Sequence, residues 1–198
     1  MRRIEPVWTV AASDVEAATA VVVLAFGGDP AARWAWPDPH KYLRHFPRFV
    51  MALGGEAYAH RAAYCTQGYS GAALWLPPGV SPDGEAVMAL FESTGSAGVR
   101  KDGPAVFERM EQYHPREPHW YLPFIGVDPS QQGKGCGAAL MRHALARCDQ
   151  DGTPAYLESS NPRNIPLYER HGFEVLGCIQ GGTSPPIVPM LRKPRHPG

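Results

Sequence analysis

One segment limits what this chain can fold into more than any other, and it is rich in glycine. Residues 127–138 read Val-Asp-Pro-Ser-Gln-Gln-Gly-Lys-Gly-Cys-Gly-Ala, between the apolar stretch Trp120–Val127 and Ala138–Cys148, whose apolar residues recur at helical spacing. This order predicts a strand, a glycine loop and a helix. Because glycines leave the backbone uncovered and the helix dipole favours negative charge, the N–H groups at the helix start predict a phosphate or pyrophosphate site. Lys134 adds positive charge at the rim.

Two other glycine motifs compete for this loop. Gly133, Gly135 and Ala138 satisfy the loose GxGxx(G/A) dinucleotide fingerprint, with Glu158 near the place of its ribose-binding acid. In that fingerprint the first glycine follows the strand almost directly, whereas residues 128–132 intervene here, and the roughly 40 residues after Glu158 are too few for the second half of such a domain. The P-loop spacing GxxxxGK(S/T) is absent from the loop. An ordinary glycine-rich turn is the structural alternative.

Two motifs together carry a family resemblance. Gln132-Gly133-Lys134-Gly135-Cys136-Gly137 resembles (Q/R)xxGx(G/A), the acetyl-CoA signature of the GNAT N-acetyltransferases, and Asn161–Phe173 resembles the second motif of that family, N…LYxxxGF. Within the family, His114–Pro118 and Leu157–Asn164 are similar to puromycin N-acetyltransferase-like members. Residues 52–112, a region that usually contributes to the acceptor pocket, show no such similarity. The resemblance therefore does not carry the identity of the acceptor.

The resemblance implies a fold and a cosubstrate. The fold is α+β, an α/β/α sandwich in which helices flank a mixed, mostly antiparallel central sheet that splays between its fourth and fifth strands, and residues 1–198 form a single domain. Acetyl-CoA is the cosubstrate, with its pyrophosphate on the backbone amides of residues 132–138 and its pantetheine arm paired like an extra strand with Ile125 and Val127. The residues implied in cofactor binding are Ile125, Gly126, Val127, Gln132, Gly133, Lys134, Gly135, Cys136, Gly137, Ala138, Asn161 and Asn164.

Three residues are candidates for the chemistry of acyl transfer, which needs a base for the amine and a proton for the leaving thiolate. The resemblance assigns the proton donor to Tyr168, which could instead be a packing residue of a short helix. A phenol of pKa ~10 that protonates a thiolate whose acid has pKa ~8.5 works uphill by about 2 kcal/mol, so we expect Tyr168 to act mainly by hydrogen-bonding the thiolate. Glu158 at the end of an apolar strand, His114, which could titrate near neutrality, and water are the alternative bases. An exposed strand end would equally explain Glu158, and a solvated loop would explain His114.

Pro123 lies inside the strand that precedes the glycine loop, and its missing N–H favours a sheet edge or a bulge. A bulge would open the sheet and turn a backbone amide toward the thioester carbonyl. Trp75, Trp120 and Tyr121 are candidates either for an acceptor pocket or for the core. Asn164 is predicted to cap the last short helix, with Pro166 in its first turn.

The rest of the chain predicts a mixture of strands and helices. The expected strands are Trp8–Val10, Ala57–Cys65, Gly71–Leu76, Trp120–Val127, Ala155–Ser159, Phe173–Gln180 and Ile187–Arg192. The expected helices are Asp14–Phe26 with Ser13 or Asp14 as its cap, His40–Leu53, one or two within Asp83–Tyr113, Ala138–Cys148, and a short helix that ends at His171. The cluster Gly27-Gly28-Asp29-Pro30 is expected to end the first helix.

Composition narrows the classes of function. The 19 Lys and Arg residues balance 19 Asp and Glu residues, which argues against a nucleic-acid or membrane-surface binder that relies on net positive charge. The four cysteines form no CxxC pair, so we expect no metal site, no disulfide framework and a reducing compartment. Glu5, Asp14 and Glu16 interrupt the approach to the apolar run Ala17–Phe26, unlike a signal peptide, and no window reaches the ~18 apolar residues of a membrane span. We therefore expect a cytoplasmic protein.

These features together predict an acetyl-CoA-dependent N-acetyltransferase that works by direct attack in a ternary complex. The expected acceptor is the primary amine of a small molecule, such as an aminonucleoside, an amino-acid-like compound or an antibiotic. At neutral pH an α-amine of pKa ~8 costs about 1.4 kcal/mol to deprotonate and a lysine-like amine of pKa ~10.4 about 4.6 kcal/mol, which favours the α-amine. A peptide or protein N-terminal acetyltransferase and a non-catalytic acyl-CoA-binding module are the alternatives. We expect a monomer or a homodimer.

Overall fold

A single mixed sheet organises the part of the chain that the computed structural model describes, residues 6–195. Its strand order is β1-β2-β3-β4-β5-β7-β6, and all neighbours are antiparallel except β4 and β5, which are parallel. The strands are β1 Val7–Thr9, β2 Ala63–Thr66, β3 Gly71–Leu76, β4 Trp120–Val127, β5 Ala155–Ser159, β6 Glu174–Val175 and β7 Val188–Arg192. The predicted mixed, mostly antiparallel sheet is therefore confirmed.

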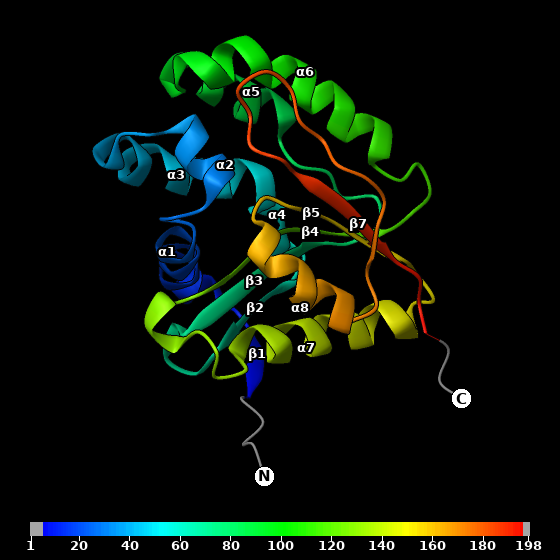
Figure 1. The fold of residues 1–198 in the computed structure, drawn as a ribbon. Coiled ribbons are helices and arrows are strands. Elements are labelled where there is room, and N and C mark those ends of the chain that lie inside the picture. The colour runs from blue at the N-terminus through cyan, green and yellow to red at the C-terminus, as the bar shows by residue number, and fades with distance from the viewer. Residues whose placement is uncertain (1–5, 196–198) are drawn as a thin grey trace.

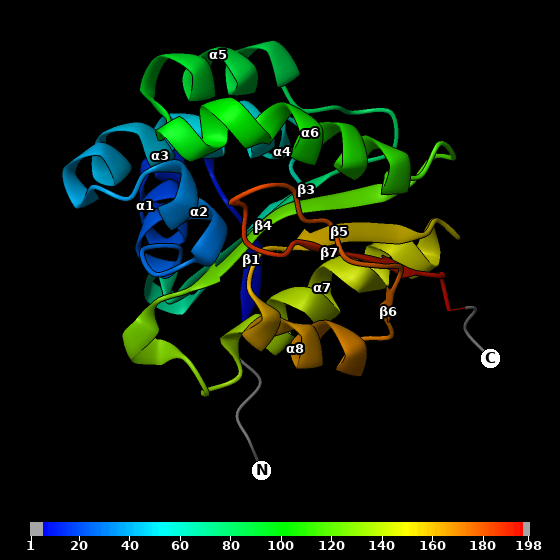
Figure 2. The same ribbon diagram turned by 45° about the horizontal axis from the view of Figure 1, so that its top comes forward.

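Helices cover both faces of this sheet. The first six lie on one face and the last two on the other, which gives three layers (Figures 1 and 2). The helices are α1 Val15–Ala25, α2 Pro30–Ala35, α3 Pro39–Gly54, α4 Glu56–Ala59, α5 Gly84–Thr94, α6 Ala97–Tyr113, α7 Cys136–Gln150 and α8 Ile165–Arg170. None of these helices combines the length and the apolar character that a membrane crossing requires, within residues 6–195.

The side chains of β3 show how the sheet separates two apolar cores. Successive residues of a strand point to opposite faces. Ala72, Leu74 and Leu76 belong to the core under α1, α3 and α5, whereas Ala73 and Trp75 belong to the core under α7. Every residue of β3 is buried, so this central strand is covered on both sides.

The sheet opens where β4 and β5 run side by side. Residues 120–122 of β4 pair with residues 155–157 of β5, and no pair continues beyond Leu122 and Leu157. The strands β4 and β5 extend further, to Val127 and Ser159. The end of β4 is thus an unpaired edge on this side, which confirms the predicted splay between the fourth and fifth strands.

A β-bulge lies at Pro123, as the missing N–H of proline favours. Leu74 pairs with Phe124 and Leu76 with Tyr121, so Leu122 and Pro123 together oppose the single residue between Leu74 and Leu76. The extra residue changes the alternation of the strand. Tyr121 and Phe124, three positions apart, consequently belong to the same core.

Three sequence predictions of local structure were wrong. The expected strand Ala57–Cys65 begins as helix α4, and β2 starts only at Ala63, because Glu and Ala favour a helix over a strand. Neither Ser13 nor Asp14 caps α1; the Ser13 hydroxyl donates to the Asp14 carboxylate instead. The last predicted strand pair shrinks to β6, one bridge between Ile179 and Ile187, and β7.

The cluster Gly27-Gly28-Asp29-Pro30 ends α1, as predicted, but it also begins a helix that the sequence analysis missed. The Asp29 carboxylate accepts hydrogen bonds from the backbone amides of Ala31 and Ala32, each at 3.0 Å, and Pro30 occupies the first turn of α2. An aspartate followed by proline is a strong start signal for a helix. The missed signal was therefore present in the sequence.

Candidate active site

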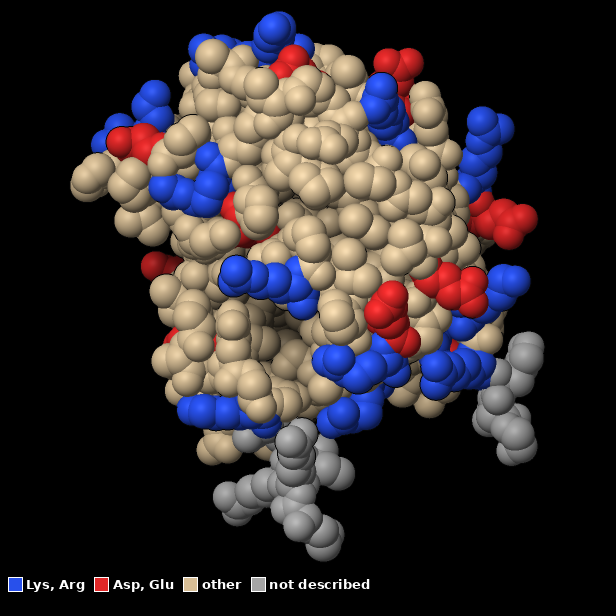
Figure 3. All heavy atoms as spheres, viewed as in Figure 1, with Lys and Arg blue, Asp and Glu red and all other residues tan. Residues whose placement is uncertain are grey.

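A cleft of about 760 Å³ opens between α1, the unpaired end of β4, the glycine loop and α8. In Figure 3 this face of the molecule is hollowed, and Lys and Arg side chains gather around the hollow. The lining residues are Leu24, Ala25, Phe26, Gly27, Gly28, Asp29, Ile125, Gly126, Val127, Pro129, Gln131, Gln132, Gly133, Gly135, Cys136, Gly137, Ala138, Asn161, Arg163, Asn164, Leu167, Tyr168 and Arg170.

The glycine loop has a backbone conformation that depends on two of its glycines. Gly133 has φ of 76° and Gly135, the residue before α7, has φ of 99°, which L side chains rarely adopt. The amides in the first turn of any α-helix have no acceptor inside the helix, and within residues 6–195 no side chain caps α7. These amides lie at the cleft because residues 135–138 line it. The arrangement suits an anionic group such as a pyrophosphate.

The residues predicted to bind the cofactor come together in this cleft with one exception. Lys134 is not part of the lining; its ammonium donates a 2.8 Å hydrogen bond to the Gln131 side chain at the exposed surface. Arg163 and Arg170, which the sequence analysis did not single out, do line the cleft. Arg163 lies in the 3-10 turn Pro162–Asn164, and Arg170 is the last residue of α8. Their positive charge suits the same anionic ligand.

Tyr168 lies in the cleft on α8, with 5% of its surface exposed. Burial raises the pKa of this phenol, and the negative charge of Asp29 adds to the effect. A phenol with a raised pKa stays protonated at neutral pH and is able to donate a hydrogen bond.

The two asparagines of the second motif also line the cleft. Asn164 occupies the N-cap position of α8, as predicted, but its side chain makes no capping hydrogen bond. Asn161 caps the preceding 3-10 turn, Pro162–Asn164, where its side-chain oxygen accepts a 3.1 Å hydrogen bond from the amide of Arg163.

A second, smaller cavity of about 110 Å³ lies between the sheet and helices α2, α3, α5 and α6. Phe26 and Asp29 line both this cavity and the large cleft, so the two spaces adjoin at the end of α1. Tyr121, Pro123 and Phe124 line the small cavity together, which the β-bulge allows by turning Tyr121 and Phe124 to one face. Glu158, from the far end of β5, completes the wall nearest the opening of the sheet.

Glu158 is enclosed rather than exposed, since its side chain is 5% accessible. One carboxylate oxygen accepts a 2.8 Å hydrogen bond from the Tyr121 hydroxyl, and the other lies 3.8 Å from Nδ1 of His114. Burial raises the pKa of Tyr121, and the charge of Glu158 raises it further. The interpretation of Glu158 as an exposed strand end was therefore wrong.

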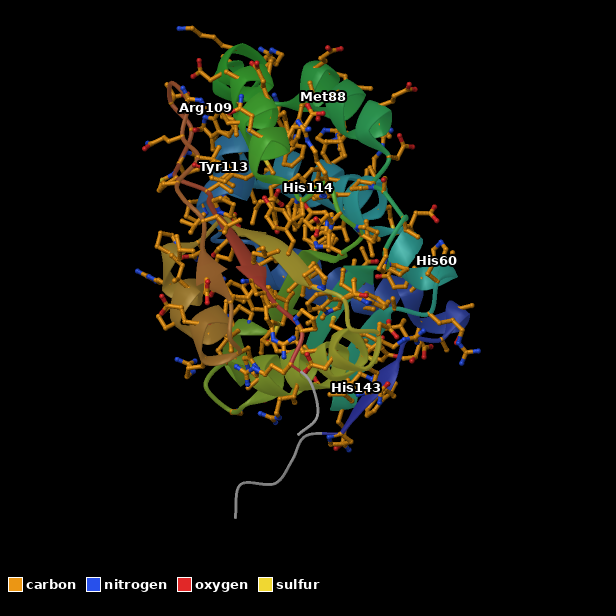
Figure 4. The ribbon with its side chains drawn as sticks, turned by 90° about the vertical axis from the view of Figure 1, so that its right-hand side faces the viewer. His60, Met88, Arg109, Tyr113, His114 and His143 are labelled. Atoms are coloured by element: carbon orange, nitrogen blue, oxygen red, sulfur yellow. The ribbon has the colours of Figure 1, made fainter. Side chains whose placement is uncertain are left out.

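His114 lies at the end of α6, between that helix and the sheet (Figure 4). Its Nε2 is 3.0 Å from Nε2 of His119, whose pKa is lowered mainly by burial. The side chain of His114 is 35% exposed, and it lines neither the cleft nor the small cavity. It thus lies between solvent and Glu158, with its Nδ1 3.8 Å from the carboxylate, slightly beyond hydrogen-bonding distance.

Asp29 is a candidate site residue that the sequence analysis missed. It is 6% exposed, and burial raises the pKa of its carboxyl group. Besides two amides of α2, the carboxylate accepts a 2.7 Å hydrogen bond from the hydroxyl of Ser160.

The three aromatic candidates for the acceptor pocket lie on different faces of the sheet. Tyr121 lines the small cavity, whereas Trp75 and Trp120 are buried on the opposite face, under α7.

Comparison with known proteins points to one family. Residues 94–173 match the Acetyltransferase (GNAT) family. An uncharacterized N-acetyltransferase of Schizosaccharomyces pombe is 28% identical over 205 residues, which cover 93% of this chain and 82% of that protein. A mycothiol acetyltransferase of Brachybacterium faecium is 30% identical over 96 residues, which cover 46% of this chain and 26% of that protein.

Solved structures agree with this result. A Corynebacterium glutamicum crystal structure, described as histone acetyltransferase HPA2 and related acetyltransferase, is 28% identical with a TM-score of 0.68, and the match covers 98% of this chain and 99% of that one. An agmatine N-acetyltransferase shares the fold at 13% identity and a TM-score of 0.63, covering 96% of this chain and all of that chain. Residues 94–173 thus match the GNAT family, and the chain as a whole is similar in sequence and fold to N-acetyltransferases.

Proposed function

We propose that this acetyltransferase transfers an acetyl group from acetyl-CoA to the primary amine of a small molecule, within a ternary complex. The observation that supports this most directly is the junction of the two spaces at Phe26 and Asp29. The large cleft has the amide-rich helix start and the arginines that a pyrophosphate requires. The small cavity has an enclosed carboxylate beside the place where both substrates would meet.

The residues of the cleft would bind acetyl-CoA, and those between the cleft and the small cavity would carry out the acetyl transfer. The glycine loop and the arginines of the cleft would hold the diphosphate, and the unpaired edge of β4 at Ile125 and Val127 would pair with the amides of the pantetheine arm. Glu158 would accept the amine proton, directly or through water, as the new C–N bond forms and the C–S bond breaks. Tyr168 would donate a hydrogen bond to the departing thiolate. His114, in contact with Glu158 and solvent, would pass the proton onward.

The shape of the small cavity favours a small acceptor over a peptide. A peptide N-terminal acetyltransferase needs room for an extended chain, whereas this cavity of about 110 Å³ is walled by four helices and the sheet. A non-catalytic CoA-binding module would not need an enclosed carboxylate next to the cleft. We propose that the acceptor is an α-amine-like nitrogen, as in the aminonucleoside, amino-acid-like or antibiotic acceptors that the resemblance to puromycin N-acetyltransferase-like members suggests.

The test is a comparison of kcat/KM among three kinds of acceptor, with release of free thiol from acetyl-CoA as the measurement. Puromycin, small α-amines and lysine-containing peptides are assayed at neutral and at alkaline pH. We expect the α-amines to be preferred at neutral pH, because a lysine-like amine costs about 3 kcal/mol more to deprotonate there. A lysine peptide that wins at neutral pH by more than about tenfold would overturn the proposal, since the site would then contain a stronger base.

A further inference from the structure

The small cavity is lined almost entirely by aromatic and aliphatic side chains. Its aromatic lining includes Trp34, Trp36, Phe46, Phe49, Phe91 and Phe107. The rings hold one another in place: Trp36 stacks on Phe91 with centroids 5.3 Å apart, and Phe49 lies 5.2 Å from Phe91. Such a wall is rigid and offers a ligand apolar contact.

The polar groups of this cavity are mostly occupied within the protein. The indole N–H of Trp34 donates to Thr183, that of Trp36 donates to Thr94, and the Tyr121 hydroxyl donates to Glu158. The Ser160 hydroxyl donates to Asp29. The hydrogen-bonding capacity that is left belongs chiefly to the carboxylates of Glu158 and Asp29.

The charges of the lining have one sign. Within residues 6–195, two acidic residues and no Lys, Arg or His line the cavity. Asp29 already accepts three hydrogen bonds from the described residues, whereas Glu158 accepts one, from Tyr121, and its other oxygen lies 3.8 Å from Nδ1 of His114, beyond hydrogen-bonding distance. A buried charge is costly unless it is paired. Glu158 therefore suits one ammonium group, and neither a carboxylate nor a second cation of a ligand would find a partner in the apolar part.

We infer that the acceptor is a monoamine with a compact aromatic or aliphatic body and no free carboxylate, an inference that rests on the proposed function. The cavity of about 110 Å³ approaches the ~150 Å³ apolar cavity that holds one benzene molecule, so a single ring matches its size. The body of the acceptor lies among the rings of α2, α3 and α5, and its amine lies at Glu158 next to the cleft.

Acceptors that differ in charge test whether the cavity excludes a carboxylate and a second cation. Phenylalaninamide and phenylalanine share the ring and the α-amine and differ in having a neutral amide or a carboxylate beside it, and lysinamide offers a second cation in place of the ring. We expect kcat/KM for phenylalaninamide to exceed both by at least about a hundredfold, because the added charge would be buried without a partner. Phenylalanine methyl ester, which keeps the ring and replaces the carboxylate by a neutral ester, should recover most of the loss.

A substitution that fills the small cavity tests whether the acceptor binds there. Met110 on α6 lines the cavity, whereas Met88 on α5, labelled in Figure 4, does not. Met110→Trp should raise KM for phenylalaninamide at least about tenfold and leave acetyl-CoA affinity nearly unchanged, while Met88→Trp changes neither of them. Thermal unfolding and acetyl-CoA binding of each variant check that the fold is intact.

The outcomes separate the inference from the proposed function. If diamines, amino sugars or free amino acids are acetylated faster than phenylalaninamide, or if Met110→Trp and Met88→Trp behave alike, the inference is wrong and the proposed function stands. If the protein binds acetyl-CoA but releases no thiol with any amine, the proposed function itself fails.

Discussion

The hydroxyl of Ser160 donates a 2.7 Å hydrogen bond to the carboxylate of Asp29, across 131 positions of the sequence. Ser160 follows β5, and Asp29 begins α2, so the bond joins the opening of the sheet to the helix that covers it. Both residues line the small cavity, and Asp29 also lines the cleft. This contact therefore fixes the boundary between the two spaces.

Ser160→Ala should lower the free energy of unfolding by about 1.5–3 kcal/mol at neutral pH, the usual range for a hydrogen bond to a charged group. Burial raises the pKa of the Asp29 carboxyl group above its ordinary value of 3.8. The protonated form of Asp29 therefore favours the folded state below pH 3.8, and this contribution to the free energy of unfolding is lost as the pH rises through the folded-state pKa. The Ser160 bond lowers that pKa, so its removal should cost more at neutral pH than near pH ~4. Urea unfolding at both pH values measures this, with Ser13→Ala, which removes an exposed hydrogen bond, as the control. An equal loss at both pH values would contradict the prediction.

Gly135→Asp should weaken acetyl-CoA binding at least about tenfold, because a carboxylate would face the anionic ligand and φ of 99° strains any side chain. Gly152→Asp is the matched control, since Gly152 also has a positive φ of 62° and open space within 4 Å of the point where a Cβ would lie, but is outside the cleft. Isothermal calorimetry gives both affinities. Equal acetyl-CoA affinities for the two variants would mean that the diphosphate does not bind at this loop.

Tyr168→Phe should lower kcat by about ten- to a thousandfold with little change in KM for acetyl-CoA, because its hydrogen bond strengthens as the thiolate leaves. Tyr64→Phe is the control, since Tyr64 is also a buried tyrosine whose pKa is raised by burial, but it does not line the cleft. Steady-state kinetics under conditions that make chemistry limiting provide the comparison. A wild-type rate for Tyr168→Phe would leave this residue a packing role only.

Glu158→Gln should lower kcat/KM for the amine by about a hundred- to ten-thousandfold, the range for loss of a general base. The variant keeps the shape of the side chain and an oxygen for the Tyr121 hydroxyl. His114→Gln should cost much less, since His114 lines neither space and would only relay the proton. Rates at several pH values distinguish the two. If His114→Gln were the slower enzyme, the base would be His114.

Asp149→Asn should lower the free energy of unfolding by about 3 kcal/mol or more at neutral pH, because it leaves the buried cation of Arg192 without its partner. Arg192 is 3% exposed and donates to both Asp149 oxygens, at 2.7 and 2.8 Å. These bonds lower the pKa of Asp149, so the stabilisation is present above 3.8 and is lost as the pH falls through the folded-state pKa.

Denaturant unfolding across this pH range is the measurement for the ion pair. Glu56→Gln, which removes a largely exposed partner of His60, serves as the control and should change stability by less than about 1 kcal/mol. A similar loss for the two variants would mean that burial of Arg192 has no energetic consequence.

The sequence by itself determined the local elements around the cleft. The bounds of β3, β4 and β5 agree with the predicted strands, because their apolar runs are bounded by glycine, proline or turn residues. Pro123 predicted the bulge through its missing N–H, and the glycine loop predicted a helix start with free amides. These features depend on interactions among neighbours in the chain.

Only the tertiary structure decided what surrounds Glu158. Its hydrogen bond with Tyr121, its proximity to His114, and the bond between Ser160 and Asp29 join residues far apart in the sequence. The apolar cavity likewise arises from four helices whose order along the chain does not specify which of their faces meet. Local propensity and periodicity report how a segment satisfies its own backbone and which of its faces is apolar, whereas the partner of each face is chosen by the packing of the whole chain.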